Sequence, residues 1–375
     1  MSKKILFFAA LALLIVVFAG TDVLAAVERP ERPERPEREV RVVSNTAREV
    51  ERAVSLGCAV LREVKNLRSL KCPKGVAEIL SLKEDVRVFA QDSGANTQIG
   101  ANAVQAGGNT GAGSKIAVLD TGYNSNHPEL STSFLGGKDF VNNDDDPLDD
   151  NGHGSHVAGI ITADGVDPKA RGVAPDAGIV AGKVLDLNGA GYFSDVVVAI
   201  YWAVDNFEVD AINLSLGTSY PYTYKKGYCD NILPEMTAAI KYARDNGVVV
   251  VAAAGNNGTR GVSIPGCISY STTVGAVDSK DRVASFSGRG NAVDISAPGV
   301  SIFSSLLGNS YASWSGTSMA TPMVSGVVAL VKSAHDAYSP SQIESALFGT
   351  AKDLGKRGKD IDYGYGRINA AGAVK

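Results

Sequence analysis

The sequence has 375 residues, of which 45% are hydrophobic and 20% are charged, and it contains 41 glycines. This length and composition allow one large folded domain with additional segments and exclude a wholly disordered chain. The formal net charge is only −4, and the sequence has no long basic stripe with interleaved aromatic residues, so we expect no nucleic-acid partner.

The first 26 residues have the pattern of a secretory signal. Lys3 and Lys4 precede an apolar run over residues 5–19, and small residues suited to cleavage follow at Ala25 and Ala26. The alternative is an uncleaved membrane anchor, which is disfavoured because the run is shorter than the roughly 20 residues that a spanning helix needs. We therefore expect a secreted, extracellular protein without stable membrane association once the signal is removed.

Residues 27–39 repeat the unit Glu-Arg-Pro, as in "ERPERPERPERE". Regularly spaced proline favours an extended polyproline conformation, and the alternating charges leave no apolar side chains for a core. We interpret this segment as a solvated linker in preference to a binding segment with a specific partner.

Residues 40–92 alternate strand-like and helical patterns in the order β-α-β-β-α-β, which predicts a small α+β domain ending in the strand-like "VRVFA" at 86–90. A unit of this size buries only a modest core by itself, so it needs a partner surface or a covalent link. A hydrophilic stretch at 91–98 then marks the boundary before the large domain of 93–375.

The four cysteines fall into two pairs that are local in sequence, Cys58 with Cys72 and Cys229 with Cys267. A secreted chain permits disulfides, and we expect these two bonds, although other pairings satisfy the same count. The spacing of the cysteines does not match that of a zinc site.

Residues 93–375 alternate short apolar runs with longer helical patterns. This alternation predicts an α/β fold, a mostly parallel sheet with helices on both faces, and in such sheets the carboxyl ends of the strands carry the site. The expected strands are at 115–120, 178–185, 210–217 and 247–255, and helices are expected at 195–207 and 236–246.

Three residues of this large domain together supply a hydroxyl, an imidazole and a carboxylate, the groups of a nucleophilic triad. Asp120 closes the strand-like run 115–120, His153 opens an apolar helix, and Ser318 stands where another helix begins. Each residue also has an ordinary alternative role. Asp120 could be a turn residue, His153 could form a metal pair with His156, and Ser318 could be a helix N-cap. No third ligand cluster accompanies the histidines.

The motifs around these residues are "AVLDTG", "NGHGSHVAG" and "SGTSMATPMVSG", and in this chain order they resemble those of the subtilisin-like serine proteases over residues 96–375. The resemblance implies a three-layer subtilisin-like fold and a serine endopeptidase that acts on polypeptides, expected to be a monomer. It assigns Asp120 to orient the imidazole, His153 to act as general base and then acid, and Ser318 to act as nucleophile.

The same resemblance extends to residues that bind the substrate. "AAAGNNG" is similar to the oxyanion-hole motif of the family and gives the side-chain amide of Asn256 the role of second donor. "LSLG" and "NGAGY" resemble the edge segments that pair with an extended substrate. The residues expected to bind substrate are Ser215, Leu216, Gly217, Gly189, Ala190, Gly191, Ala254 and Gly255.

Under this resemblance, residues 40–92 are an N-terminal propeptide that acts as chaperone and inhibitor of its own enzyme and is removed between residues 88 and 98. Two other functions stay open. One is a catalytically inactive relative that serves as a binding module, which the intact triad opposes. The other is a lipase or esterase, which needs G-x-S-x-G around its nucleophile and a different triad order.

The loop "NNDDDPLDDNG" at 142–152 carries five aspartates, and like charges this close favour a hard cation. The sequence predicts a calcium ion bound by Asp144, Asp146 and Asp149, in agreement with the resemblance; a solvated acidic loop is the alternative. Glu129 with the turn at 163–170 is a second candidate site, weakened because Val166 stands where relatives often place an asparagine ligand.

Overall fold

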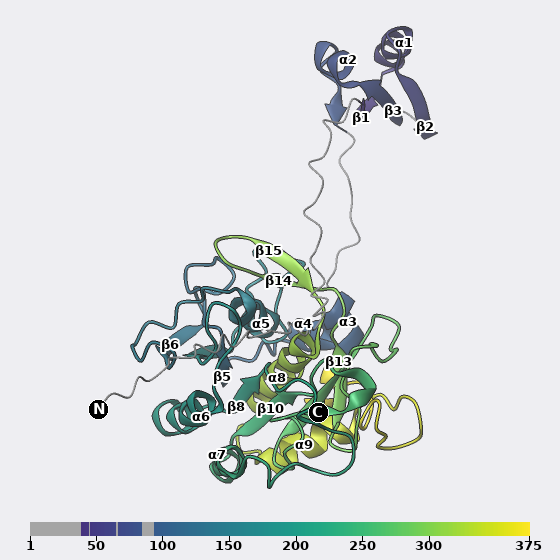
Figure 1. The fold of residues 1–375 in the computed structure, drawn as a ribbon. Coiled ribbons are helices and arrows are strands. Elements are labelled where there is room, and N and C mark those ends of the chain that lie inside the picture. Colours follow the sequence, from purple (N-terminus) through teal and green to yellow (C-terminus); the bar gives the residue numbers. More distant parts are fainter. Residues whose placement is uncertain (1–38, 45, 65–66, 85–93) are drawn as a thin grey trace, which may run out of the picture. The chain divides into compact units, whose positions relative to one another are not determined.

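The computed structural model describes residues 39–44, 46–64, 67–84 and 94–375, and the chain divides into two compact units, Met1–Phe89 and Ala90–Lys375. Figure 1 shows the fold as a ribbon, with most of the helices and several strands labelled. The expected signal, nearly all of the expected linker and the expected strand at 86–90 lie outside the described residues. So does the first part of the expected cleavage region, up to residue 93.

The described residues of the first unit form a four-stranded antiparallel sheet with two helices, in the strand order β2-β3-β1-β4. Thr46 begins the first helix by accepting a hydrogen bond from the N–H of Glu49, and that helix buries Val50 and Ala53. The elements are β1 (Glu39–Ser44), α1 (Ala47–Ser55), β2 (Ala59–Val64), β3 (Leu67–Pro73), α2 (Lys74–Ile79) and β4 (Lys83–Glu84).

The second unit is built on a seven-stranded parallel sheet in the order β13-β12-β10-β8-β5-β7-β6. The next two strands along the chain, β6 and β7, lie on one side of β5 in the strand order, and the later strands lie on its other side. The direction of the strand order therefore reverses at β5, and its carboxyl end lies at a topological switch point. The strands are β5 (Lys115–Asp120), β6 (Phe134–Asp139), β7 (Gly178–Lys183), β8 (Ala211–Leu214), β10 (Val249–Ala253), β12 (Thr272–Val277) and β13 (Ile295–Pro298).

Helices cover both faces of this sheet, because successive residues of each strand point to opposite faces. In β5, Ile116 and Val118 belong to the core on the face of α5 and α8, while Ala117 and Leu119 belong to the core on the opposite face, which α6 and α7 cover. The helices are α3 (Gly94–Ile99), α4 (Ala101–Ala106), α5 (His153–Thr162), α6 (Phe193–Phe207), α7 (Pro234–Asp245), α8 (Thr317–Ala334), α9 (Pro340–Gly349) and α10 (Ala370–Ala373). The predicted α/β class is confirmed.

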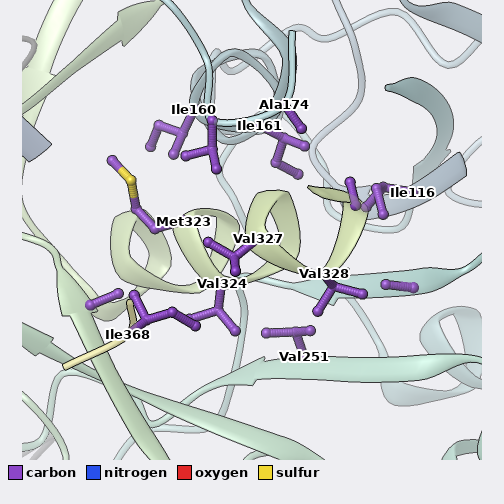
Figure 2. Packing of buried hydrophobic residues seen from close by; sticks show 14 of the residues in the cluster. Ile116, Ile160, Ile161, Ala174, Val251, Met323, Val324, Val327, Val328 and Ile368 are labelled. Carbon is purple, nitrogen blue, oxygen red and sulfur yellow. The ribbon is translucent and has the colours of Figure 1, made fainter. Parts of the chain in front are cut away.

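Helix α8 is the centre of the larger core. Figure 2 shows Val324, Val327 and Val328 of α8 between Ile161 on one side and Val251 of the sheet on the other.

Among the described residues, no helix is long and apolar enough to cross a membrane. The remaining elements are the 3₁₀ helix η1 (Gly258–Arg260) and two small antiparallel pairs, β9 (Thr223–Tyr224) with β11 (Val262–Ser263) and β14 (Ile302–Ser305) with β15 (Tyr311–Trp314).

Candidate active site

Asp120 lies at the carboxyl end of β5, at the switch point of the sheet, and is fully buried. Its Oδ1 accepts a hydrogen bond from the N–H of Thr121 at 2.7 Å and lies 2.7 Å from Nδ1 of His153. Gly122 follows with a φ of +122°, and a Cβ there would lie 2.6 Å from the carbonyl of Pro147. The turn that aims Asp120 therefore requires glycine.

His153 is the first residue of α5, and the carboxylate of Asp149 organises the turn that holds it. Asp149 accepts hydrogen bonds from the N–H groups of Asn151 at 3.0 Å, Gly152 at 2.8 Å and Ser155 at 2.8 Å. Burial opposes the charged form, but the hydroxyl of Ser155, which donates to Asp149 at 2.6 Å, and these backbone N–H groups outweigh burial and lower the pKa of Asp149. The carboxylate thus stays charged at the N-terminus of α5, where a negative charge is favourable.

The electrostatics of His153 are set by Asp120. Burial alone would lower the pKa of His153, but the negative charge of Asp120 and its hydrogen bond outweigh burial and leave the pKa raised. The imidazolium form is therefore stabilised by its neighbour. A base in this setting accepts a proton more readily than a free imidazole does.

Ser318 is the second residue of α8, where the backbone N–H groups of the first helical turn have no carbonyl within the helix to pair with. Its hydroxyl donates to the carbonyl of Ser215 at 3.0 Å, so in this conformation the proton is not directed at His153. Catalytic hydrogen bonds are often absent or long without substrate. Transfer to His153 requires the proton of Ser318 to be redirected from the carbonyl of Ser215.

Asn256 follows β10, and its side-chain amide has a defined orientation. Its Oδ1 accepts hydrogen bonds from the N–H of Thr317 at 3.0 Å and from the hydroxyl of Thr317 at 3.1 Å. The Nδ2 group is therefore the end that faces the open site next to Ser318. Gly255, with a φ of +85°, permits this turn, because a Cβ there would lie only 1.9 Å from the hydroxyl of Ser263.

A cleft of about 640 Å³ joins these groups. Its walls include His153, Asn256 and Ser318, while Asp120 lies behind the wall. Of the eight residues expected to bind substrate, seven line the cleft, and the eighth, Ala254, is buried away from it: the lining residues are Ser215, Leu216, Gly217, Gly189, Ala190, Gly191 and Gly255.

Comparison with known proteins identifies the family. The model described as Subtilase family matches residues 111–366, which is more than half of the chain. The chain belongs to the subtilase family. Its enzyme class is therefore that of a subtilisin-like serine endopeptidase, and polypeptides are its substrates.

Three named relatives are similar over most of the chain. The thermophilic serine proteinase of Bacillus sp. strain AK1 is 44% identical over 264 residues, which cover 70% of this chain and 62% of the relative. The subtilisin of Bacillus pumilus is 40% identical over 74% of this chain and 97% of its own length. The thermostable alkaline protease of Halalkalibacterium halodurans is 37% identical over 88% and 89% of the two chains.

Subtilisins generally bind calcium, but the contacts of Glu129 in this subtilase oppose its predicted role as a calcium ligand. Its buried carboxylate accepts hydrogen bonds from the N–H groups of Gly165 at 2.6 Å, Val166 at 3.0 Å and Asp167 at 2.7 Å. The hydroxyl of Tyr311 donates to the same carboxylate at 2.9 Å. Four donors occupy the oxygens that a cation would need.

The predicted calcium loop also fails to gather its ligands. Asp149 is buried and both of its carboxylate oxygens accept hydrogen bonds, which opposes its predicted role as a ligand. Asp144 and Asp146 are exposed and accept from the N–H groups two residues further on. Within the part of the chain that the structure describes, no group of three or more His, Cys, Asp or Glu side chains could hold a metal ion.

His156 is not a second catalytic histidine or half of a metal pair. It is buried, its Nε2 hydrogen-bonds the carbonyl of Ala312 at 3.0 Å, and its ring stacks on Trp314 with centroids 4.6 Å apart. Burial lowers the pKa of His156 to about 4. It therefore remains neutral while His153 takes up protons, and Trp314 also stacks against His153 at 6.2 Å.

Lys183 connects the parts of the site and is not among the residues that the sequence motifs indicate. This buried lysine donates from Nζ to the carbonyl of Thr121 at 2.8 Å, the carboxylate of Asp150 at 2.7 Å and the carbonyl of Leu185 at 2.8 Å. It thus ties the turn after Asp120 to the loop before His153. Its only sequence signal is a charged residue inside the apolar run "GIVAGKVL".

Proposed function

We propose that this subtilase hydrolyses peptide bonds through an acyl-enzyme, with Ser318 as nucleophile, His153 as general base and acid, and Asp120 as the orienting carboxylate. The observation that carries the proposal is the 2.7 Å contact between Asp120 Oδ1 and His153 Nδ1, at the wall of a cleft that Ser318 also lines. This contact fixes the proton on Nδ1 and leaves Nε2 to exchange protons with the substrate side.

In acylation, Ser318 Oγ bonds to the carbonyl carbon of the substrate and gives its proton to His153. The carbonyl oxygen then carries the negative charge, next to the N–H of Ser318 and the Nδ2 group of Asn256. Collapse of this intermediate breaks the C–N bond, and His153 returns the proton to the leaving amine. Water then gives a proton to His153 and attacks the carbonyl carbon of the ester. Collapse breaks the bond to Ser318 Oγ, which takes the proton back from His153, and the acid product is released.

The substrate is an extended polypeptide that pairs with the backbone of two segments on the cleft wall, 189–191 and 215–217. Backbone pairing gives affinity without strong selection of sequence, while side-chain pockets give selectivity. Both segments line the cleft that holds the candidate nucleophile, which supports this binding mode. We propose that the enzyme acts as a monomer, because the residues needed for the reaction come from one chain.

The enzyme is made as a secreted precursor that processes itself. Residues 1–26 are the signal, residues 27–39 are a linker, residues 40–92 act as chaperone and inhibitor, and residues 93–375 form the catalytic domain. The division of the chain into two compact units at residues 89 and 90 supports a junction between residues 88 and 98. Parallel sheets with many non-local contacts fold slowly, so a folded template lowers the barrier to forming the catalytic domain.

The Ser318→Ala variant tests the proposal. We expect it to lack casein hydrolysis and to accumulate as a precursor without its signal, since the same nucleophile cuts substrate and propeptide. As a control for folding, active enzyme added in trans should convert this precursor to the mature size, with a new N-terminus between residues 88 and 98. Self-maturation of purified Ser318→Ala would disprove the role of Ser318. A wild-type chain without casein hydrolysis would favour the binding module.

A further inference from the structure

Helix α8 contains a proline close to the candidate nucleophile. In an α-helix, each carbonyl accepts a hydrogen bond from the N–H four residues later. The partner of the Ser318 carbonyl would be residue 322, which is proline and has no N–H. The helix therefore leaves the main-chain carbonyl of Ser318 without its usual donor.

The hydroxyl of Ser215 supplies a donor in its place. Ser215 is buried, follows β8 directly, and donates from Oγ to the carbonyl of Ser318 at 2.9 Å. The hydroxyl of Ser318 in turn donates to the carbonyl of Ser215 at 3.0 Å. Two reciprocal hydrogen bonds thus join the first turn of α8 to the segment after β8.

Two further buried side chains orient the hydroxyl of Ser215. Asn213 of β8 donates from Nδ2 to Ser215 Oγ at 2.9 Å, and the hydroxyl of Ser325 donates to Asn213 Oδ1 at 2.9 Å. The carbonyl of Thr321, at 3.3 Å, is the longer alternative acceptor for Ser325. Because Asn213 already donates to Ser215, the proton of the Ser215 hydroxyl is directed at Ser318. Ser325 lies two helical turns after Ser318, so the chain of bonds begins and ends on α8.

We propose that Ser215 is a positioning residue for the nucleophile, whose hydroxyl replaces the N–H that Pro322 lacks, and that Asn213 and Ser325 keep this hydroxyl aimed. The proposal rests on the proposed role of Ser318. The hydroxyl of Ser215 takes no part in bond making or breaking. It fixes the first turn of α8, and with it the Oγ of Ser318 and the N–H that faces the developing oxyanion.

A double-mutant cycle with Ser215→Ala and Pro322→Ala tests this role. In the wild-type background, we expect Ser215→Ala to lower kcat about 10- to 100-fold on a peptide anilide with little change in KM, since a small displacement of a reacting group costs turnover. In the Pro322→Ala background, the N–H of residue 322 pairs with the Ser318 carbonyl. In that background, Ser215→Ala should lower kcat less than about threefold, because the hydrogen bond from the Ser215 hydroxyl is then duplicated by the one from the N–H of residue 322.

A pair of single substitutions gives an independent measurement. Ser325→Ala removes the last hydroxyl of the chain of bonds and should lower kcat about threefold or more, because Ser215 is then less well oriented. The matched control is Ser114→Ala, which also removes a buried hydroxyl that donates to α8, at the carbonyl of Ala329, 2.8 Å away. It should lower the melting temperature and leave kcat unchanged.

All variants are matured in trans with immobilised active enzyme, and their concentration is set by titration with a phosphonofluoridate, which counts competent nucleophiles. Equal losses from Ser215→Ala in both backgrounds would overturn the proposal. A rise in KM at constant kcat in Ser215→Ala would also overturn the proposal. Equal effects of Ser325→Ala and Ser114→Ala on kcat would do the same. Activity in Ser318→Ala would instead refute the proposed function. An inactive Ser318→Ala beside an unaffected Ser215→Ala refutes the positioning role alone.

Discussion

His153 Nδ1 lies 2.7 Å from Asp120 Oδ1, and this contact makes the imidazole a stronger base than its burial would allow. His153 must be neutral to accept the proton of Ser318. Because its pKa in the folded enzyme is raised above 6.5, the protonated, inactive form persists to a higher pH than for a free histidine. We expect kcat/KM to fall as the pH decreases, with a midpoint above 6.5, in assays across a pH series.

The Asp120→Asn variant separates the charge of the carboxylate from its size. It should lower turnover by about 10,000-fold and move the acidic midpoint of kcat/KM to lower pH, since burial then acts on His153 without a compensating charge. The matched control is Asp205→Asn, an exposed carboxylate on α6 that accepts from Tyr242. An unchanged midpoint in Asp120→Asn would show that another group sets the pKa of His153.

Asn256 is predicted to act through the donors of its amide. Asn256→Ala should lower kcat about 100- to 1000-fold with a small effect on KM, because the lost hydrogen bond forms only with the oxyanion. Asn256→Asp keeps an acceptor for the N–H and hydroxyl of Thr317 but removes the donors and adds a negative charge. Its kcat should be as low as that of Asn256→Ala or lower. A near-normal kcat in Asn256→Asp would mean that the residue only supports the turn.

The sequence was sufficient to predict the α/β class and most of the residues that line the cleft, because chemistry-bearing motifs follow buried strands or open helices. Four of the seven strands were expected. The segment that forms β6, "FLGGKD", was missed because its glycines are selected by packing: a Cβ on Gly137 would lie 2.4 Å from Pro147. Strand β12 begins with Thr272 and Thr273, and β13 has only four residues, so neither gives a long apolar run.

The contacts that oppose the predicted metal ligands could not be found from the sequence. Local charge density indicates a cation, but the partners of Asp149 and Glu129 are mainly backbone N–H groups, which every residue carries and no composition reveals. The contact of Glu129 with Tyr311 spans a sequence separation of 182 residues. Such contacts are fixed by the tertiary fold. The orientation of the Ser318 hydroxyl toward Ser215 likewise depends on packing between α8 and β8.

Glu129 is predicted to stabilise the 165–167 turn without calcium. Burial and the hydrogen bond to Glu129 raise the pKa of Tyr311 to about 12, so its hydroxyl remains a donor. Glu129→Gln should lower the free energy of unfolding by about 1–3 kcal/mol, because the turn's N–H groups lose a charged acceptor, and Tyr311→Phe by about 1 kcal/mol. The measurement is denaturant unfolding of inhibited enzyme.

Calcium provides the control for this prediction. If Glu129 were a ligand, Glu129→Gln would reduce the difference between the melting temperatures in EDTA and in millimolar calcium, by mass action. We expect that difference to be the same in the wild type, Glu129→Gln and the Asp144→Ala, Asp146→Ala double variant. A smaller difference in any of these variants would place an ion at the substituted residues.

The disulfide between Cys229 and Cys267 is predicted to stabilise the mature enzyme. It closes a loop with a sequence separation of 38 residues. Removing it by paired substitution to alanine should lower the free energy of unfolding by about 3–4 kcal/mol, since the unfolded chain regains the entropy of an open loop. Ser263 lies within this loop, and its hydroxyl donates at 2.6 Å to the carbonyl of Thr218, which lies outside the loop. Both residues line the cleft, so KM should rise as well.

The second disulfide, Cys58–Cys72, is the matched control because it lies in the proposed propeptide. Paired alanine substitutions there should slow maturation, since the small core of that unit loses its covalent link, and leave the unfolding free energy of the mature enzyme unchanged. Denaturant unfolding of both double variants, matured in trans and inhibited to prevent autolysis, compares the two bonds directly. If loss of Cys58–Cys72 destabilised the mature protein, the first unit would have to remain part of it, and the proposed processing would be wrong.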